Sequence, residues 1–267
     1  MIKKIVCLML LYLCFGCSNN IANSNIDDDK NLLNEPKNLY KLAKFNFDQQ
    51  NFEISRNQFI ELKKLFPLSN EAIQSEIMIA FIDYVQMDYD SAILNYNSVI
   101  NKYPSHKDLD YVYYMIAMSN YEQITNYSLD GMYNDLALSS FQQVINRFPM
   151  SKYAKDSRQK IILVKSNKAG KHMDIGRFYL KDRKYTAALN RFKIVVEEYS
   201  MTKFSPEALH RMVEIYFHLG MKTEAVNSAS VLGYNYPNSK WYRYSYELIK
   251  EKDKDDSFLN KLIKPFS

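Results

Sequence analysis

The side chains that could carry out catalysis or bind a metal are few in this 267-residue sequence. Histidine is the residue type that titrates near neutral pH without help, and the chain has four, His106, His172, His210 and His218. His210 and His218 lie eight residues apart on one predicted helix, whereas metal ligands on one helix typically stand a single turn apart. We therefore interpret the histidines as ordinary surface or groove residues.

Other catalytic patterns are also missing from the sequence. It contains no glycine-rich phosphate loop, no Gly-x-Ser-x-Gly and no His-Glu-x-x-His. The acidic runs from Asp27 to Asp29 and from Glu251 to Asp256 have no companion ligands and are typical of solvated charge. We therefore expect a protein that is not an enzyme and that uses no metal and no cofactor.

The three cysteines, Cys7, Cys14 and Cys17, all lie within the first 17 residues. A disulfide or a thiolate metal site in the rest of the chain is therefore excluded. Residues 1–16 consist of a basic start, a short apolar run and a terminal glycine, which predicts an export signal peptide. The apolar run is too short to span a membrane as a helix.

The position of Cys17 directly after Gly16 resembles a bacterial lipobox, although Cys14 stands where leucine is usual. The resemblance implies cleavage before Cys17, a diacylglyceryl group on its thiol and acylation of the new amino group. Ser18 further implies transport to the outer membrane, with the body on the periplasmic side. The alternative is an ordinary signal peptide with an incidental cysteine.

Composition and charge divide the remainder of the chain. Residues 17–35 are rich in Asn, Asp and Ser and are expected to form a lipidated N-terminus and flexible tether. Residues 36–250 are expected to form the folded body, and residues 251–267 a charged tail. The net charge is +5, of which the signal peptide carries Lys3 and Lys4, so the body does not have the strong positive charge typical of nucleic-acid binding.

Proline placement reveals an internal repeat. Only 6 glycines and 7 prolines occur, which favours long helices. Four of the prolines follow an aromatic residue, and Ser200 follows Tyr199 in the same context. Counting back 12, 8 and 5 residues from each of these five terminators gives a small, a large and an aliphatic residue, except that the middle residue of the fifth set is alanine. The sets are Ser55, Phe59 and Leu62; Ala92, Tyr96 and Val99; Ala137, Phe141 and Val144; Ala188, Phe192 and Val195; Ala225, Ala229 and Leu232.

These spacings place each set on one face of a helix, which proline then ends. A second small or close-packing residue lies 24 residues before four of the terminators, at Ala43, Ala80, Gly176 and Val213. Each unit is therefore predicted to be a pair of antiparallel helices with the tetratricopeptide pattern. The expected fold is all-α, a superhelical stack of five tetratricopeptide-like helix pairs, or α-solenoid.

The terminators are separated by 37, 45, 51 and 37 residues. The separation of 45 residues is longer than the shortest one, 37, and this excess predicts a loop inserted between Tyr121 and Ala137. The separation of 51 residues exceeds 37 by 14. Because the segment 154–169 carries no helix breaker, this second excess predicts an extension of the first helix of the fourth unit.

Tyrosine is abundant, with 22 residues, and the stretch from Asp110 to Tyr114 is not explained by the repeat. In one interpretation Val112 and one tyrosine pack while the other tyrosines lie on a wet surface. In the other, Tyr111 and Tyr114 line the concave groove and offer rigid aromatic area to an extended peptide. Both interpretations remain open at this point.

From about Leu39 to Tyr244 the chain resembles the BamD (YfiO/ComL) family, the lipoprotein component of the machinery that assembles outer-membrane β-barrel proteins. The resemblance rests on the lipoprotein start, the five units and four local stretches. These are Phe66-Pro67-Leu68-Ser69, Asp110-Tyr111-Val112-Tyr113-Tyr114-Met115, Phe148-Pro149-Met150-Ser151-Lys152-Tyr153 and Ala188-Leu189-Asn190-Arg191.

The resemblance implies a scaffold without catalysis. Its partners would be a POTRA domain of a BamA-type barrel protein, unfolded outer-membrane β-barrel precursors and other assembly lipoproteins. Arg191 falls where the family has an arginine implicated in the BamA contact. The nearest alternative is another tetratricopeptide envelope lipoprotein, such as a secretin pilotin or a cell-wall and division coordinator, which generally lacks the aspartate–tyrosine stretch.

Overall fold

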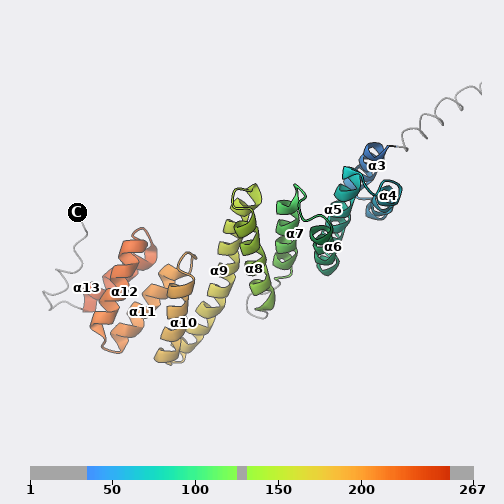
Figure 1. Ribbon diagram of the computed structural model, residues 1–267. Coiled ribbons are helices and arrows are strands. Elements are labelled where there is room, and N and C mark those ends of the chain that lie inside the picture. The colour runs from blue at the N-terminus through green and yellow to red at the C-terminus, as the bar shows by residue number, and fades with distance from the viewer. Residues whose placement is uncertain (1–34, 125–130, 253–267) are drawn as a thin grey trace, which may run out of the picture. The chain divides into compact units, whose positions relative to one another are not determined.

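A computed structural model describes residues 35–124 and 131–252 of the chain (Figure 1). Every regular element in these two ranges is an α-helix, in agreement with the predicted all-α class. The chain divides into two compact units between Lys102 and Tyr103.

The first unit contains two helix pairs. Helices α3 and α4 pack on each other, as do α5 and α6, while α4 and α5 join the two pairs. The bounds are α3 Pro36–Asp48, α4 Phe52–Leu65, α5 Asn70–Val85 and α6 Tyr89–Lys102.

The second unit contains three further pairs, α7 with α8, α9 with α10 and α11 with α12, followed by α13. The five pairs and their order match the predicted tetratricopeptide-like repeat. The bounds are α7 Leu109–Glu122, α8 Met132–Arg147, α9 Lys152–Lys181, α10 Tyr185–Glu198, α11 Ser205–His218, α12 Lys222–Asn235 and α13 Lys240–Lys252.

The second helix of every pair buries the residues that the repeat predicts. Phe59, Tyr96, Phe141 and Phe192 are all completely buried, and the small and aliphatic residues of each set are buried with them. In the first unit, Phe59 packs with Ala43, Ile79 and Ile82. The 4 and 3 residue spacings therefore identify the core-facing side of these helices, as an amphipathic helix requires.

Each second helix ends two residues before its terminator. The aromatic residue at the end, such as Phe66 with φ −131° and ψ 58°, has already left the helical conformation, as expected for a residue whose successor is proline. Tyr199 does the same before Ser200. After Phe66 a hydroxyl caps the next helix, α5, because Ser69 accepts a hydrogen bond from the Ala72 amide at 3.0 Å.

The first helix of the fourth pair approaches its partner closely at Gly176. A Cβ built at this residue would lie 2.6 Å from Cε1 of Phe192, which is far inside van der Waals contact. Ala43, Ala80 and Val213, at the matching positions of other pairs, are completely buried. The small residue predicted on the first helix therefore lets the second helix approach.

Four of the turns inside the pairs contain a residue with positive φ. These are Gln50 at 62°, Met87 at 64°, Arg183 at 55° and Gly220 at 75°. In the last of these turns the Met221 amide bonds back to the Tyr216 carbonyl, which is the Schellman pattern. Glycine is the residue that tolerates this conformation best, yet three of the four turns use another residue.

Helix α9 runs without a break for 30 residues from Lys152 to Lys181. This confirms that segment 154–169 extends the first helix of the fourth pair. The predicted inserted loop falls between the end of α7 and the start of α8, and its residues 125–130 lie outside the described residues.

Helix α13 is an element that the repeat does not predict. It packs on α11 and α12, with Ser245 completely buried and Ile249 almost so. Gly233 of α12 admits the Tyr242 ring of α13, because a Cβ there would lie 2.6 Å from that ring. The helix includes Glu251 and Lys252, where the charged tail was expected to begin.

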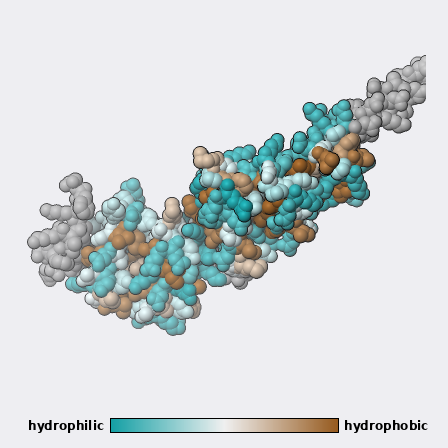
Figure 2. Space-filling model, viewed as in Figure 1, coloured by the Kyte–Doolittle hydropathy of each residue, from teal (hydrophilic) through white to brown (hydrophobic). Residues whose placement is uncertain are grey.

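The predicted signal peptide, the anchor Cys17 and most of the tether and tail lie outside the described residues. None of the described helices has the length and apolar character that would let it cross a membrane. The visible face of the described residues is mainly hydrophilic, with apolar side chains in separate patches (Figure 2).

Candidate partner-binding surfaces

The side chains of the described residues do not assemble a metal site. No group of three or more His, Cys, Asp or Glu residues within 35–124 and 131–252 is arranged to hold an ion. Three places in the described part of the chain could bind another molecule. They are the tyrosine stretch on α7, the surroundings of Arg191 on α10, and a cavity in the last two pairs.

The tyrosine stretch lies at the start of α7, and Val112 within it is completely buried. The rings of Tyr111 and Tyr114 both contact Tyr153 of α9, with centroids 5.5 and 5.0 Å apart. The Tyr114 hydroxyl donates a hydrogen bond to Asp156 at 2.6 Å. The two predicted site residues are therefore brought together around Tyr153, and both remain half-exposed.

The neighbouring residues fix the same junction between helices. Asp110 accepts a hydrogen bond from the Ser151 hydroxyl, which caps α9. The Tyr113 ring lies against Phe148, and the Arg147 guanidinium lies 5.0 Å from the Tyr113 centroid. All three tyrosines have an aromatic neighbour and are half-buried, so the interpretation with only one packed tyrosine is wrong on that point. The stretch therefore holds three partly exposed rings against other aromatic side chains.

Arg191 occupies a position that carries a polar contact in other pairs. The residue nine places before the terminator is Gln58, Asn95 or Ser140 in the first three pairs. Each of these bonds to a polar side chain of the first helix, with lengths of 2.9, 2.7 and 3.1 Å. The matching first-helix residue in the fourth pair is Tyr179. Arg191 makes no hydrogen bond or ion pair with any residue in the described part of the chain, and it is half-exposed.

The charge of Arg191 acts on a histidine of the neighbouring helix. His172 of α9 is partly buried, and its pKa is lowered first by that burial and then by the charge of Arg191. Lys168 and Lys171 lower the pKa further, whereas Glu198 raises it. A guanidinium without an internal partner can form two parallel hydrogen bonds with a carboxylate of another chain.

His210 differs from the surface residue that the sequence predicts. It is 5% exposed, and its Nδ1 lies 2.8 Å from the hydroxyl of Ser245 on α13. Its Nε2 lies 3.4 Å from Glu214. These residue types resemble a hydrolase triad, but Ser245 is completely buried and no substrate can reach it. The expectation of a surface or groove position is therefore wrong for His210, whose contacts hold α13 to α11.

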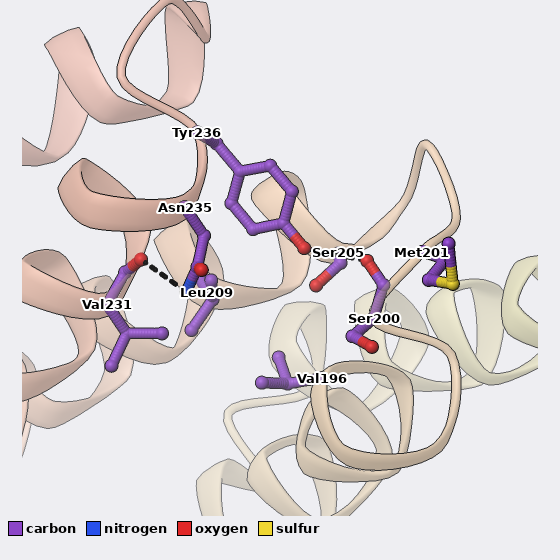
Figure 3. Close-up of a pocket in the computed structure, with 8 residues that line it drawn as sticks. All are labelled: Val196, Ser200, Met201, Ser205, Leu209, Val231, Asn235 and Tyr236. Carbon is purple, nitrogen blue, oxygen red and sulfur yellow. Dashed lines mark hydrogen bonds between the residues drawn. The ribbon is translucent and has the colours of Figure 1, made fainter.

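A cavity of about 350 Å³ lies where the end of α10, the start of α11 and the end of α12 meet (Figure 3). Two of its lining residues are joined by a hydrogen bond, which the Tyr236 hydroxyl donates to the Ser200 carbonyl at 2.6 Å. The Ser205 hydroxyl is buried without a hydrogen-bond partner. Sequence reasoning missed this cavity because its residues come from three helices and share no motif. They are Val196, Ser200, Met201, Ser205, Leu209, Val231, Asn235 and Tyr236.

Comparison with known proteins identifies the family of this chain. Residues 33–232 match the sequence profile of YfiO, described as "Outer membrane lipoprotein". The chain belongs to the YfiO family. The match includes all five helix pairs except the end of α12, and it contains Tyr111, Tyr114 and Arg191.

Two YfiO-family relatives are similar over most of their length. One from Rickettsia prowazekii, named "Outer membrane protein assembly factor BamD", is 40% identical over 212 residues, which cover 79% of this chain and 84% of that protein. A protein of the same name from Caulobacter vibrioides is 35% identical over 213 residues, or 80% of this chain and 70% of that one. Among solved structures, a TPR repeats protein from Bacteroides fragilis is 11% identical, with a TM-score of 0.46 over 82% of this chain and 99% of that one.

Proposed function

We propose that this protein is a non-catalytic scaffold of the machinery that assembles outer-membrane β-barrel proteins. The observation that carries the proposal is the similarity to relatives named as assembly factors, at 40% identity over 79% of this chain. The helix-pair architecture supports it, because stacked helix pairs provide extended surfaces for binding other chains.

The scaffold is anchored through Cys17 in the outer membrane, on the periplasmic side. The lipobox-like start of the sequence supports this part of the proposal. A single acyl chain binds membranes only marginally, so the diacylglyceryl group together with the amide-linked chain gives a stable anchor.

The C-terminal helix pairs dock a POTRA domain of a BamA-type barrel protein, and Arg191 contacts a carboxylate of that domain. Its half-exposed guanidinium has no partner among the described residues, which supports this role. The third helix pair takes part in receiving unfolded barrel precursors, with the half-exposed rings of Tyr111 and Tyr114 contacting an extended chain.

Co-purification from detergent-solubilised membranes tests the proposal. The tagged full chain should recover a POTRA-bearing barrel protein, and Arg191→Glu should reduce that recovery at least tenfold. Lys193→Glu, on an exposed residue of the same helix, makes the same change of charge and should leave recovery intact. Recovery of a secretin or of division proteins without such a barrel protein would replace this function by the pilotin or division alternative.

A further inference from the structure

The formal positive charge of helix α9 is larger than the net charge of the whole chain. It has nine Lys and Arg residues against two Asp, a formal charge of +7, whereas the whole chain carries +5. Internal contacts account for part of this excess. Lys168 pairs with Asp135 at 2.7 Å, Arg177 pairs with Glu207 at 2.7 Å, and the Lys160 ammonium lies 4.7 Å from the Tyr121 ring centroid.

The two halves of α9 pack against different helices. Its C-terminal half buries Ala169, Met173 and Gly176 under α10, whose Phe192 and Val195 belong to the same core. Figure 1 shows α8 beside one end of α9 and α10 beside the other, in agreement with the contacts of α9.

Helix α10 ends level with the middle of α9. The two helices are antiparallel, and the rings of Tyr199 and His172 are stacked with centroids 5.9 Å apart. Tyr199 is the residue that directly follows α10. Residues of α9 that precede Lys168 therefore project beyond the end of α10.

The face of α9 that α10 covers continues into this projecting half. Stepping back from Ala169 by 4, 7, 11 and 14 residues gives Lys165, Ile162, Arg158 and Lys155, and these spacings keep to one side of a helix. Lys155 and Arg158 are exposed, whereas Ile162 and Lys165 are half-buried. We call these four residues the α9 basic face.

The cations of the α9 basic face lack carboxylate partners in the described part of the chain. Lys155 and Lys165 make no hydrogen bond or ion pair there, and Arg158 donates only to the Pro149 carbonyl at 3.3 Å. The face spans roughly 15 Å along the helix axis. It therefore has the spacing of a helix-packing surface, an apolar residue at its centre and unpaired positive charge around it.

We propose that the α9 basic face is a docking site for an acidic helical segment of a partner protein. The segment packs on the N-terminal half of α9, on the same face that α10 covers in the C-terminal half. It places an apolar side chain on Ile162, and its carboxylates pair with Lys155, Arg158 and Lys165. The α9 basic face continues the surface of α9 on which α10 packs, and it has only one apolar residue to bury in a membrane. Both observations favour a packed helix over an anionic membrane surface.

A synthetic peptide tests this docking site directly. The probe is a labelled helical peptide of about 15 residues, long enough to form a helix, with glutamates flanking one leucine on a single face. Fluorescence anisotropy with the full chain carrying Cys17→Ser should give saturable binding. The triple variant Lys155→Glu/Arg158→Glu/Lys165→Glu should weaken binding at least tenfold, and Ile162→Asp alone should weaken it several-fold.

Matched controls separate the site from general charge attraction. Lys181→Glu/Lys193→Glu/Lys250→Glu makes the same change of charge on exposed residues elsewhere in the second unit and should keep wild-type affinity. A peptide of the same composition with its glutamates spread around the helix should not distinguish wild type from the triple variant. Should the triple variant unfold, Lys155→Gln/Arg158→Gln/Lys165→Gln replaces it.

Two outcomes would overturn the proposal. Equal loss of peptide binding in both triple variants would show nonspecific attraction. Unchanged peptide binding by Lys155→Glu/Arg158→Glu/Lys165→Glu, together with its loss of binding to phosphatidylglycerol vesicles, would assign the face to a membrane.

Discussion

Gly176 and Phe192 face each other across the fourth helix pair so closely that a Cβ on the glycine would lie 2.6 Å from Cε1 of the ring. Phe192 is completely buried and cannot swing into open space. The approach of α9 and α10 therefore depends on the absence of a side chain at one position, and this dependence can be measured.

Gly176→Ala should destabilise the protein by about 1–3 kcal/mol, because the added methyl overpacks the core. The sign of this change in stability is informative, since replacing glycine by alanine inside an unhindered helix stabilises by about 1 kcal/mol. Thermal and denaturant melts measure the effect. Phe192→Leu in the same chain should recover part of the loss, and additive losses would show that the two residues do not compete for space.

Two of the turns inside helix pairs predict opposite changes in stability, one when glycine is removed and the other when glycine is introduced. Gly220→Ala should cost about 1 kcal/mol because φ is +75° and no atom lies within 4 Å of the new Cβ, so the strain is in the backbone alone. Arg183→Gly should stabilise by up to about 1 kcal/mol for the same reason, since its φ is +55°. Arg183→Ala, which removes the side chain but keeps the strain, is the control in chemical denaturation.

Phe59→Asp should destabilise the first unit by several kcal/mol, because an unpaired carboxylate would be buried among Ala43, Ile79 and Ile82. Ile60→Asp is the matched control, since the neighbouring side chain is 38% exposed and points away from that core. Tyr96→Asp should act like Phe59→Asp in the second pair. If Ile60→Asp and Phe59→Asp cost the same in a melting experiment, the helix face is assigned wrongly.

His172 predicts a pH dependence of stability. Burial and then the charge of Arg191 lower its pKa below the ordinary value of 6.5. The unfolded chain therefore binds this proton more tightly, so the His172 contribution is complete above pH 6.5 and is lost as the pH falls. Arg191→Gln should raise the pKa of His172 in an NMR titration, whereas Lys193→Gln should leave it unchanged.

Cys17→Ser should leave a chain that is either unprocessed or detached from the membrane. The reason is that the thiol is the predicted point of lipid attachment. Intact mass and membrane fractionation measure both consequences, with Ser18→Ala as the neighbouring control for lipid attachment. A Cys17→Ser chain with the same mass shift and the same membrane location as wild type would contradict lipidation.

The sequence predicted the parts of the fold that repeat. Proline spacing identified five helix pairs, and the excess of 14 residues before Ser200 identified the long α9. Helix α13 escaped prediction because it has no terminator and no second helix to pair with. The turn at Arg183 could be predicted, but its positive φ could not, since the sequence signal for positive φ is glycine.

The candidate sites were predicted less completely than the fold. Tyr111 and Tyr114 could be selected by type, but their shared neighbour Tyr153 lies on another helix and only the structure brings it near. The unpaired state of Arg191 becomes visible only when its repeat position is compared with Gln58 and Asn95, which have partners. The cavity near Ser205 and the α9 basic face depend on where helices end in space, which no local motif reports.

The docking of α13 decides where the array of helices stops. A stack of similar pairs presents an unfilled groove at its last member, into which the first helix of another such stack could fit. Here the buried Ile249 and the Tyr242 ring over Gly233 already fill that groove on α11 and α12. Among the described residues, α13 therefore acts as the capping element that the last helix pair of a repeat array needs for its exposed apolar face.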